Sequence, residues 1–539
     1  MTYVYAFDHP HKGSLDETKA LVGGKGANLA VMASELGLPV PPGFTISTEA
    51  CRTYLTDGWP DGLDDEIRDH VRRVEDTVGR RFGDPSAPLL VSVRSGAPIS
   101  MPGMMDTILN LGINDVTEHG LVESSGDPAF VEACRERFVS MYREIVGAGD
   151  VPEDPFDQLR GAIEAVFRSW NGDRARSYRA HEGIPEDLGT GVTVQAMVFG
   201  NSGPNSATGV VFTRNPANGE HVLYGDVLFN AQGEDVVAGT HATEPIAYLD
   251  ERAPDIAAEL RTRADQLERH YADLCDIEFT IESGKLWMLQ TRVGKRSPEA
   301  ALRIAIDMAE DPEFPLTPEE AVLRVVEHLA EPPTAATKRS KETAAVATGL
   351  AASPGLATGE IVTTPDAAVE AGADGRSVIL VRRETSPDDV HGMAAAAGIL
   401  TTTGGLASHA AVVARGWGVP AVVGAGEVEI VDSTIRIGDC ELVVGDTLTI
   451  DGSSGEIFLG EVVGETSILP EAVQLLTWAD ELGINVRSLE EEDTTMTPAG
   501  DATSGDDRNS GTATVELMVR LLSIKGFATP DAAAAALQT

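Results

Sequence analysis

Lysine is nearly missing from this chain of 539 residues, and positive charge as a whole is scarce. Lysine and arginine together number 41, against 85 aspartates and glutamates, so the net charge at pH 7 is −44. The lysines are Lys12, Lys19, Lys25, Lys285, Lys295, Lys338, Lys341 and Lys525. Such an acidic surface repels phosphate backbones and anionic lipids, so we expect neither nucleic acid nor a membrane as a partner.

Cysteines are few and long apolar runs are lacking. Cys51, Cys134, Cys275 and Cys440 lie far apart and form no CxxC pair, which argues against a disulfide scaffold and a zinc site. The N-terminal MTYVYAF has neither the basic start nor the apolar run of a signal peptide. No apolar stretch approaches the roughly 20 residues of a membrane span. We therefore expect a cytoplasmic protein.

The composition is otherwise that of a folded globular protein. Hydrophobic residues make up 42% of the chain and charged residues 23%, which is ordinary for chains that bury a core. The length predicts three or four domains. Strand and helix patterns alternate along the chain, so the expected fold class is α/β (α+β) and multidomain.

The most informative stretch is TTTGGLASHAAVVARGWGVP, residues 401–420. A strand ending near Thr403 and a glycine turn predict a helix that opens near Ser408 and His409 and breaks at Gly416 to Gly418, where Pro420 prevents its continuation. An imidazole in a helix's first turn feels the positive end of the helix dipole, which favours its neutral form and stabilises an attached phosphoryl group. The alternative interpretation is an ordinary surface or capping histidine.

Two arginine- or lysine-bearing motifs come earlier in the chain. GGKGANLA, residues 23–30, predicts a glycine turn into a helix, where free N–H groups and Lys25 can bind phosphate, although the P-loop pattern GxxxxGK[ST] is absent. The strand Leu89–Val93 delivers Arg94, whose guanidinium can bind phosphate oxygens with two parallel bonds. A plain loop-to-helix turn and a surface salt-bridge arginine are the alternatives.

The segment CDIEFTIESGKLWMLQTRVG, residues 275–294, predicts a β-hairpin. Alternation places Asp276, Glu278 and Thr280 on one face of its first strand. On its second strand Leu286, Met288 and Gln290 are expected to share a face that continues to Arg292. Carboxylate and amide oxygens on adjacent strands are ligands that magnesium accepts when it also holds phosphates. The alternative is a hairpin with a solvated polar face.

These segments carry a resemblance to a known family. GGLASHAAVVARGWGVPAVVG resembles the phosphohistidine segment of dikinases that use phosphoenolpyruvate, and SVRSG…SMPGMMDTILNLG is similar to the pyruvate, phosphate dikinase branch. The resemblance covers nearly all of residues 12–295, where it implies an ATP-grasp-like nucleotide-binding fold. It implies that the histidine at position 409 is phosphorylated and that its domain swivels between two active sites.

Carried over residue by residue, the resemblance implies a set of site residues, with ATP as substrate and Mg²⁺ as cofactor. The positions that match contacts to ATP phosphates are Lys25, Arg94, Gly209, Asp235 and Arg292. Glu278 and Gln290 match nucleotide and metal positions, with Asp276 beside them. The family's regulatory threonine, two residues before the phosphorylated histidine, is replaced by Ala407, so regulation by phosphorylation there is not expected.

The expected domain organisation has six parts. They are a nucleotide-binding region at 1–295, a helical linker and hinge at 296–350, a small β/α swivelling phosphohistidine domain at 351–462, a remnant of the family's barrel connection at 463–488, a disordered linker at 489–511 and a helical pair at 512–539. Because a (β/α)₈ barrel needs about 250 residues, we expect the pyruvate-binding barrel to be lacking and a separate barrel-bearing subunit to supply it. Homo-oligomerisation is left open.

The resulting functional expectation is phosphorylation of His409 by ATP and inorganic phosphate, followed by transfer to pyruvate bound by another chain. Two other readings are open. One is an antibiotic phosphotransferase of the rifamycin type, which needs a substrate domain between the ATP region and the histidine. The other is a non-catalytic nucleotide-binding regulator that signals through His409.

Overall fold

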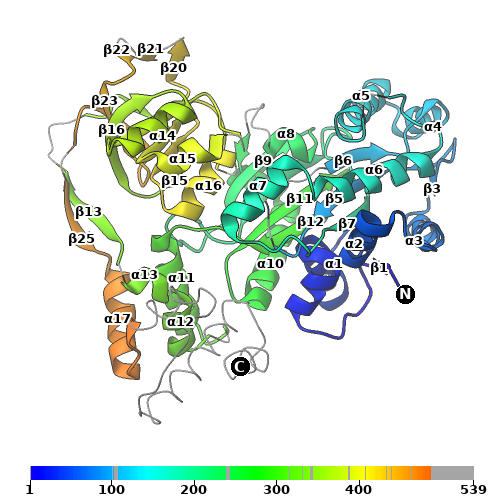
Figure 1. The fold of residues 1–539 in the computed structure, drawn as a ribbon, viewed down its shortest axis with the longest axis horizontal. Coiled ribbons are helices and arrows are strands. Elements are labelled where there is room, and N and C mark those ends of the chain that lie inside the picture. The colour runs from blue at the N-terminus through cyan, green and yellow to red at the C-terminus, as the bar shows by residue number, and fades with distance from the viewer. Residues whose placement is uncertain are drawn as a thin grey trace.

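The computed structural model describes residues 2–99, 101, 107–147, 149–237, 243–314, 316–330, 332–339, 344–386, 389–406, 408–431, 434–438, 440–462 and 464–486. The predictions for Ala407, for the linker at 489–511 and for the helical pair at 512–539 lie outside these residues. Within them the chain folds as a multidomain mixture of helices and separate sheets, which confirms the predicted fold class (Figure 1). No helix in the described ranges combines the length and the apolar character that a bilayer span requires.

Two five-stranded antiparallel sheets form the first region. The first has the order β1 (Val4–Ala6), β2 (Gly43–Ile46), β7 (Gly191–Ala196), β5 (Val91–Gly96) and β6 (Thr107–Leu111). The second has the order β10 (Glu244–Pro245), β9 (Tyr224–Phe229), β8 (Ala207–Phe212), β11 (Cys275–Glu282) and β12 (Lys285–Val293). Helix α1 (Leu15–Ala30) contacts strands of both sheets, so it ties them together.

Helices cover both sheets. With the first sheet lie α2 (Thr48–Asp57), α3 (Leu63–Val78), the short pair β3 (Arg81–Phe82) and β4 (Pro88–Leu89), α4 (Asp115–Ser125), α5 (Pro128–Ile145), α6 (Pro155–Ser169) and α7 (Asp173–Glu182). With the second lie a π-helical turn at Val31–Glu35, α8 (Gly233–Val237), a 3₁₀ turn at Ile246–Tyr248, α9 (Leu249–Arg252) and α10 (Pro254–Tyr271).

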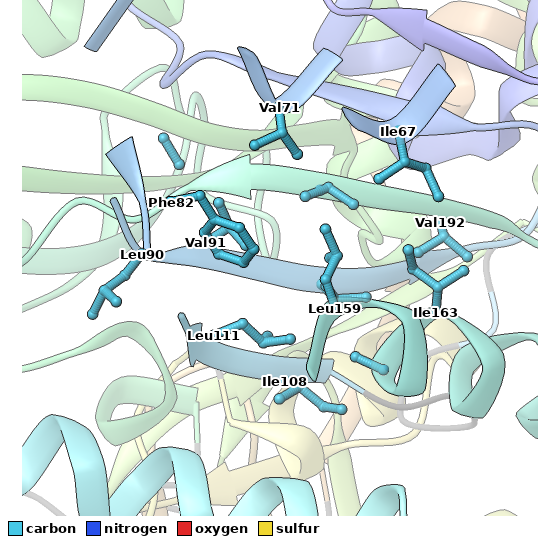
Figure 2. Packing of buried hydrophobic residues seen from close by; sticks show 14 of the residues in the cluster. Ile67, Val71, Phe82, Leu90, Val91, Ile108, Leu111, Leu159, Ile163 and Val192 are labelled. Carbon is cyan, nitrogen blue, oxygen red and sulfur yellow. The ribbon is translucent and has the colours of Figure 1, made fainter. Parts of the chain in front are cut away.

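The core of the first sheet shows how alternation orients the site. Ile67 and Val71 of α3 and Leu159 and Ile163 of α6 share one hydrophobic core with strand residues such as Val91 (Figure 2). Along β5, Val91 and Val93 enter this core, whereas Ser92 and Arg94 line a cavity. The period of two in a strand therefore aims Arg94 away from the core.

The predicted hairpin at 275–294 is confirmed, but one statement about its faces is wrong. Glu278 pairs with Gln290, whereas the next residue, Phe279, pairs with Met288. Leu289 is therefore the extra residue of a β-bulge, and a bulge reverses the alternation beyond it. Leu286 and Met288 lie in the hydrophobic core, so they do not share a face with Gln290 and Arg292, which line the cavity.

The described parts of the connections to the next domain contain helices and paired strands. Helices α11 (Pro298–Glu310), α12 (Pro318–Arg324), α13 (Val326–Ala330) and α17 (Pro470–Leu482) bury one hydrophobic core together. Strand β13 (Thr334–Arg339) enters the next domain and pairs antiparallel with β25 (Gly464–Ile468), which leaves it. The two connections thus form one ribbon, which Figure 1 shows between the helices and the domain above them.

The third unit is here called the carrier domain, and its strands lie between residues 347 and 459. It contains an eight-stranded mixed sheet. Its order is β14 (Ala347–Thr348), β24 (Glu456–Leu459), β23 (Thr447–Asp451), β16 (Leu356–Val362), β17 (Val378–Arg382), β18 (Gly398–Thr401), β19 (Ala421–Val423) and β15 (Leu350–Ser353). A smaller sheet contains β20 (Val428–Val431), β21 (Thr434–Ile437) and β22 (Cys440–Val443). The helices are α14 (Pro365–Ala373), α15 (Val390–Ala395) and α16 (His409–Trp417).

Gly23 provides a test of how tightly α1 is held between the sheets. It kinks the helix with φ of 74°, and a Cβ there would lie 1.6 Å from the carbonyl oxygen of Gly96. We expect Gly23→Ala to lower the free energy of unfolding by about 3 kcal/mol or more, because strain and overlap add. In the control Gly37→Ala, φ is 58° but nothing lies within 4 Å, so only about 1–2 kcal/mol is expected. Calorimetric unfolding measures both, and equal losses would contradict this account.

Candidate active site

A cavity of about 640 Å³ lies between the two sheets of the first region. Its walls come from α1, from the end of β5, from β8 and from the β11–β12 hairpin. Of the sequence-predicted residues, it brings together Lys25, Arg94, Gly209, Glu278, Gln290 and Arg292. Segments that are more than 250 residues apart in the chain thus meet in one space.

The glycines of this cavity are required by close packing. The kink at Gly23 starts the second half of α1, where Gly24 donates its N–H to the carbonyl of Ala97 at 2.9 Å and Lys25 follows. A Cβ at Gly209 would lie 2.6 Å from both the carbonyl oxygen of Asp226 and the ring of Phe279. Glycine therefore lets these backbone segments pack closely where a side chain would not fit.

Arg94 is held rigidly at the end of β5. Its Nη2 donates to Gln195 Oε1 at 2.5 Å and to the carbonyl of Leu289 at 3.1 Å, and its Nη1 lies 3.7 Å from Glu278 Oε2. The side chain is only 10% exposed. A guanidinium oriented in this way loses little freedom when it binds an anion.

Glu278 and Gln290 are cross-strand neighbours on the cavity face of the hairpin. Gln290 Nε2 donates to Glu278 Oε1 at 3.1 Å. Among the described residues, no group of three or more histidines, cysteines or acidic residues could hold a metal by itself. One carboxylate and one amide oxygen do fit a magnesium ion that arrives with nucleotide phosphates, since Mg²⁺ commonly uses one or two protein oxygens and keeps phosphate or water as the rest.

Asp276 and Asp235 do not line the cavity. Asp276 accepts from Arg292 Nε at 2.7 Å and lies 2.6 Å from Arg292 Nη2; burial raises the pKa of this carboxyl, and Arg292 opposes that effect. Asp235 accepts from Arg137 Nη2 at 2.8 Å and from the backbone N–H of Gln232 at 2.9 Å. Asp276 thus orients a cavity arginine, and Asp235 fixes the loop that brings Gln232 to the cavity.

His409 begins α16 as predicted, with Ser408 as the N-cap residue and Gly418 closing the helix in the left-handed conformation. Its Nδ1 lies 3.3 Å from Thr385 Oγ1, which occupies that ring nitrogen. Burial lowers the pKa of His409, and the charge of Asp389 opposes this. The predicted neutral imidazole is consistent with this shift, although burial is its largest cause.

The carrier domain is docked on the second sheet, beside the cavity. Tyr224 Oη donates to the carbonyl of Ala351 at 3.1 Å. A Cβ at Gly405, four residues before His409, would lie 2.6 Å from Asp226 Oδ2 and 3.4 Å from Thr243 Oγ1. In Figure 1, α16 accordingly lies next to β9. His409 itself is not part of the cavity lining.

The residues of the second sheet that contact the carrier domain were not predicted from the sequence. Tyr224 and Asp226 occur in LYGDVLF, which indicates a strand and nothing more. Thr385 and Asp389 precede a short helix in the carrier domain and reach His409 only through the fold. No signal within either segment could have identified these roles, because each depends on a partner far away in the chain.

Comparison with known proteins agrees with this arrangement. Residues 19–63, 59–257 and 249–312 match the family profile described as the pyruvate phosphate dikinase AMP/ATP-binding domain. The chain belongs to the pyruvate, phosphate dikinase family. Residues 375–455, which include His409, match the mobile domain of phosphoenolpyruvate-utilising enzymes. The ATP-grasp-like expectation for the first region is consistent with the first match.

Relatives in this dikinase family cover most of the chain. The pyruvate, phosphate dikinase of Rhizobium meliloti (strain 1021) is 46% identical over 89% of this chain and 60% of its own length. That of Clostridium symbiosum is 42% identical over the same shares. The chloroplastic protein of Flaveria pringlei is 43% identical over 89% of this chain and 55% of its own length. The chain thus spans 55–60% of the length of these three relatives.

The surroundings of His409 predict its titration. Its pKa should fall below the ordinary value of 6.5, so the ring is neutral at pH 7. Asp389→Asn should lower the pKa further, because it removes a charge that opposes the effect of burial there. Histidine-selective ¹³C NMR, assigned with His409→Asn, measures both. A His409 pKa above 6.5, or a rise in Asp389→Asn, would contradict this environment.

Proposed function

We propose that this chain is a phosphotransferase that carries out the nucleotide half-reaction of a pyruvate, phosphate dikinase. In this reaction, ATP, inorganic phosphate and His409 yield AMP, pyrophosphate and phosphohistidine. The observation that carries the proposal is the docking of the His409 helix beside a cavity that collects Arg94, Glu278, Gln290 and Arg292. The family membership supports the same reaction.

Each residue then has a defined task. Neutral His409 Nε2 attacks the β-phosphorus of ATP, and AMP leaves with the electrons of the broken P–O bond. Inorganic phosphate accepts the γ-phosphoryl group and becomes pyrophosphate. Lys25, Arg94 and Arg292 offset negative charge on the transferring groups. Glu278 and Gln290 would hold Mg²⁺, which when bound neutralises phosphate charge.

The second half-reaction needs a different site. Phosphohistidine passes its phosphoryl group to pyruvate, giving phosphoenolpyruvate, and the β13–β25 ribbon is the pivot on which the carrier domain leaves the cavity. We assign the acceptor site to a pyruvate-binding barrel outside the residues described here. Transfer of label from His409 to pyruvate that requires an added barrel supports this assignment, and transfer without one opposes it.

Of the two other readings, the antibiotic phosphotransferase is disfavoured by the region that should contain its substrate domain. The described residues between 296 and 346 form three helices, which pack with α17, and one ribbon strand. A non-catalytic regulator differs from the proposed enzyme in one measurable respect, because it would bind ATP without releasing AMP.

Isotope labelling tests the phosphoryl carrier. With [β-³²P]ATP, phosphate and Mg²⁺, we expect the chain to become labelled and His409→Asn to remain unlabelled. His391→Asn is the matched control, since that histidine is on the same domain but is exposed and paired with Asp366 at 3.1 Å. The control should label like the wild type. Equal labelling of His409→Asn and wild type would contradict the assignment.

The metal site predicts a second behaviour. Glu278→Gln keeps the shape of the cross-strand pair but removes the carboxylate charge, so AMP formation should fall about 100-fold or more and require higher Mg²⁺. Chelation with EDTA should stop the wild type altogether. Titrations of AMP release against Mg²⁺ measure both effects, and an unchanged midpoint in Glu278→Gln would remove this residue from the metal site.

A further inference from the structure

Arg415 is a fully buried cation at the boundary between the carrier domain and the first region. It lies on α16, six residues after His409. Its Nη1 donates to the carbonyl of Ala352 at 3.0 Å and its Nη2 donates to the carbonyl of Leu406 at 2.7 Å. Leu406 belongs to the turn that precedes His409, so the guanidinium fastens this turn to strand β15.

The outer side of Arg415 faces the first region. Its guanidinium carbon lies 5.3 Å from the centre of the Phe212 ring, and the charges of Asp276 and Asp226 act on it. Burial lowers the pKa of Arg415 to about 10, and Tyr224, Asp276 and Asp226 oppose this shift. A cation without water is tolerated only where opposite charges compensate it. The docked position therefore depends on these carboxylates.

The register of the second sheet connects this contact with the cavity. Tyr224 pairs with Phe212, Phe212 with Asp276, and Asp276 with Arg292, so the four residues form one row across β9, β8, β11 and β12. Directly opposite residues lie on the same face of a sheet. Tyr224 and Phe212 contact the carrier domain at one end of this row, and Arg292 lines the cavity at its other end.

Asp276 is the member of the row that both sides share. It is buried and holds Arg292 through two contacts of 2.6 and 2.7 Å, and its charge also acts on Arg415. If the proposed function is right, nucleotide phosphates compete with Asp276 for Arg292. The carboxylate then has Arg415 as its remaining buried counter-charge, and the docked position gains stability.

We propose that Arg415 is a positioning residue that couples nucleotide binding to docking of the carrier domain through the row Arg292–Asp276–Phe212. Nucleotide in the cavity strengthens the interaction of Asp276 with Arg415, and this interaction keeps the turn before His409 in its docked position. Release of the nucleotide weakens that interaction and lets the domain leave. This inference rests on the proposed nucleotide site but not on any chemical step at His409.

Docking can be measured without catalysis. Spin labels at Val369→Cys in α14 and Val116→Cys in α4, both exposed positions, report the distance between the domains in a His409→Asn, Cys440→Ser background. The distance distribution is recorded with and without a nonhydrolysable ATP analogue and Mg²⁺. The docked fraction should rise with the analogue in this reference protein.

Three variants decide the mechanism. Arg415→Met should lower the docked fraction and remove its dependence on the analogue, whereas Arg415→Lys, which keeps the charge, should retain part of that dependence. Asp276→Asn should dock equally with and without saturating analogue. The control Arg436→Met, at an exposed arginine of the carrier domain paired with Glu441, should behave like the reference.

Thermodynamic reciprocity supplies a second readout. If docking and nucleotide binding are coupled, the factor by which the analogue raises the docking equilibrium constant equals the factor by which docking tightens binding of the analogue. Arg415→Met, which loses this coupling, should therefore bind the analogue about fivefold or more weakly in calorimetry. Unchanged docking and unchanged affinity in Arg415→Met, with a normal thermal midpoint, would overturn the proposal. Nucleotide-dependent docking without any labelling of His409 would leave it standing and remove the proposed function instead.

Discussion

The contact of the carrier domain with the second sheet is the interaction on which the arrangement depends. Tyr224 and Asp226 on one side meet Ala351 and Gly405 on the other, and the turn of His409 lies within this contact. A phosphoryl carrier must be held firmly enough to orient its nucleophile, yet it must also be released. Among the described residues this boundary contains the Tyr224–Ala351 hydrogen bond, the close approach of Gly405 to Asp226 and the buried cation of Arg415, and polar contacts of this kind can be both formed and released.

The negative net charge of the whole chain makes the cations at the cavity important for binding an anion. A net charge of −44 opposes the approach of ATP, and salt screens that opposition only beyond about 10 Å. The cations of the cavity therefore act at short range, and two of them are among the eight lysines of the sequence. The cavity cations are Lys19, Lys25, Arg94 and Arg292. Magnesium bound to the phosphates would reduce the remaining repulsion.

The sequence predicted those elements whose signals are local. The positions of the glycines and the helical spacing predicted the ends of α16 to within one residue. The alternation of apolar and polar residues predicted the hairpin. The prediction of which side chains share a face was wrong at the β-bulge, because no residue type in this segment indicates the bulge at Leu289. The pairing of β13 with β25 could not be predicted from the sequence, because the partner strand lies over 120 residues further on. Tyr224, Asp226 and the row through Asp276 required the register of four strands.

The most direct measurement is a crystal structure of the chain with a nonhydrolysable ATP analogue and Mg²⁺. The account predicts the phosphate chain between Arg94 and Arg292, the metal on Glu278 and Gln290, and the β-phosphorus within about 3.5 Å of His409 Nε2. An analogue bound outside the cavity, or a carrier domain that turns His409 away from the phosphates while the cavity is filled, would contradict it.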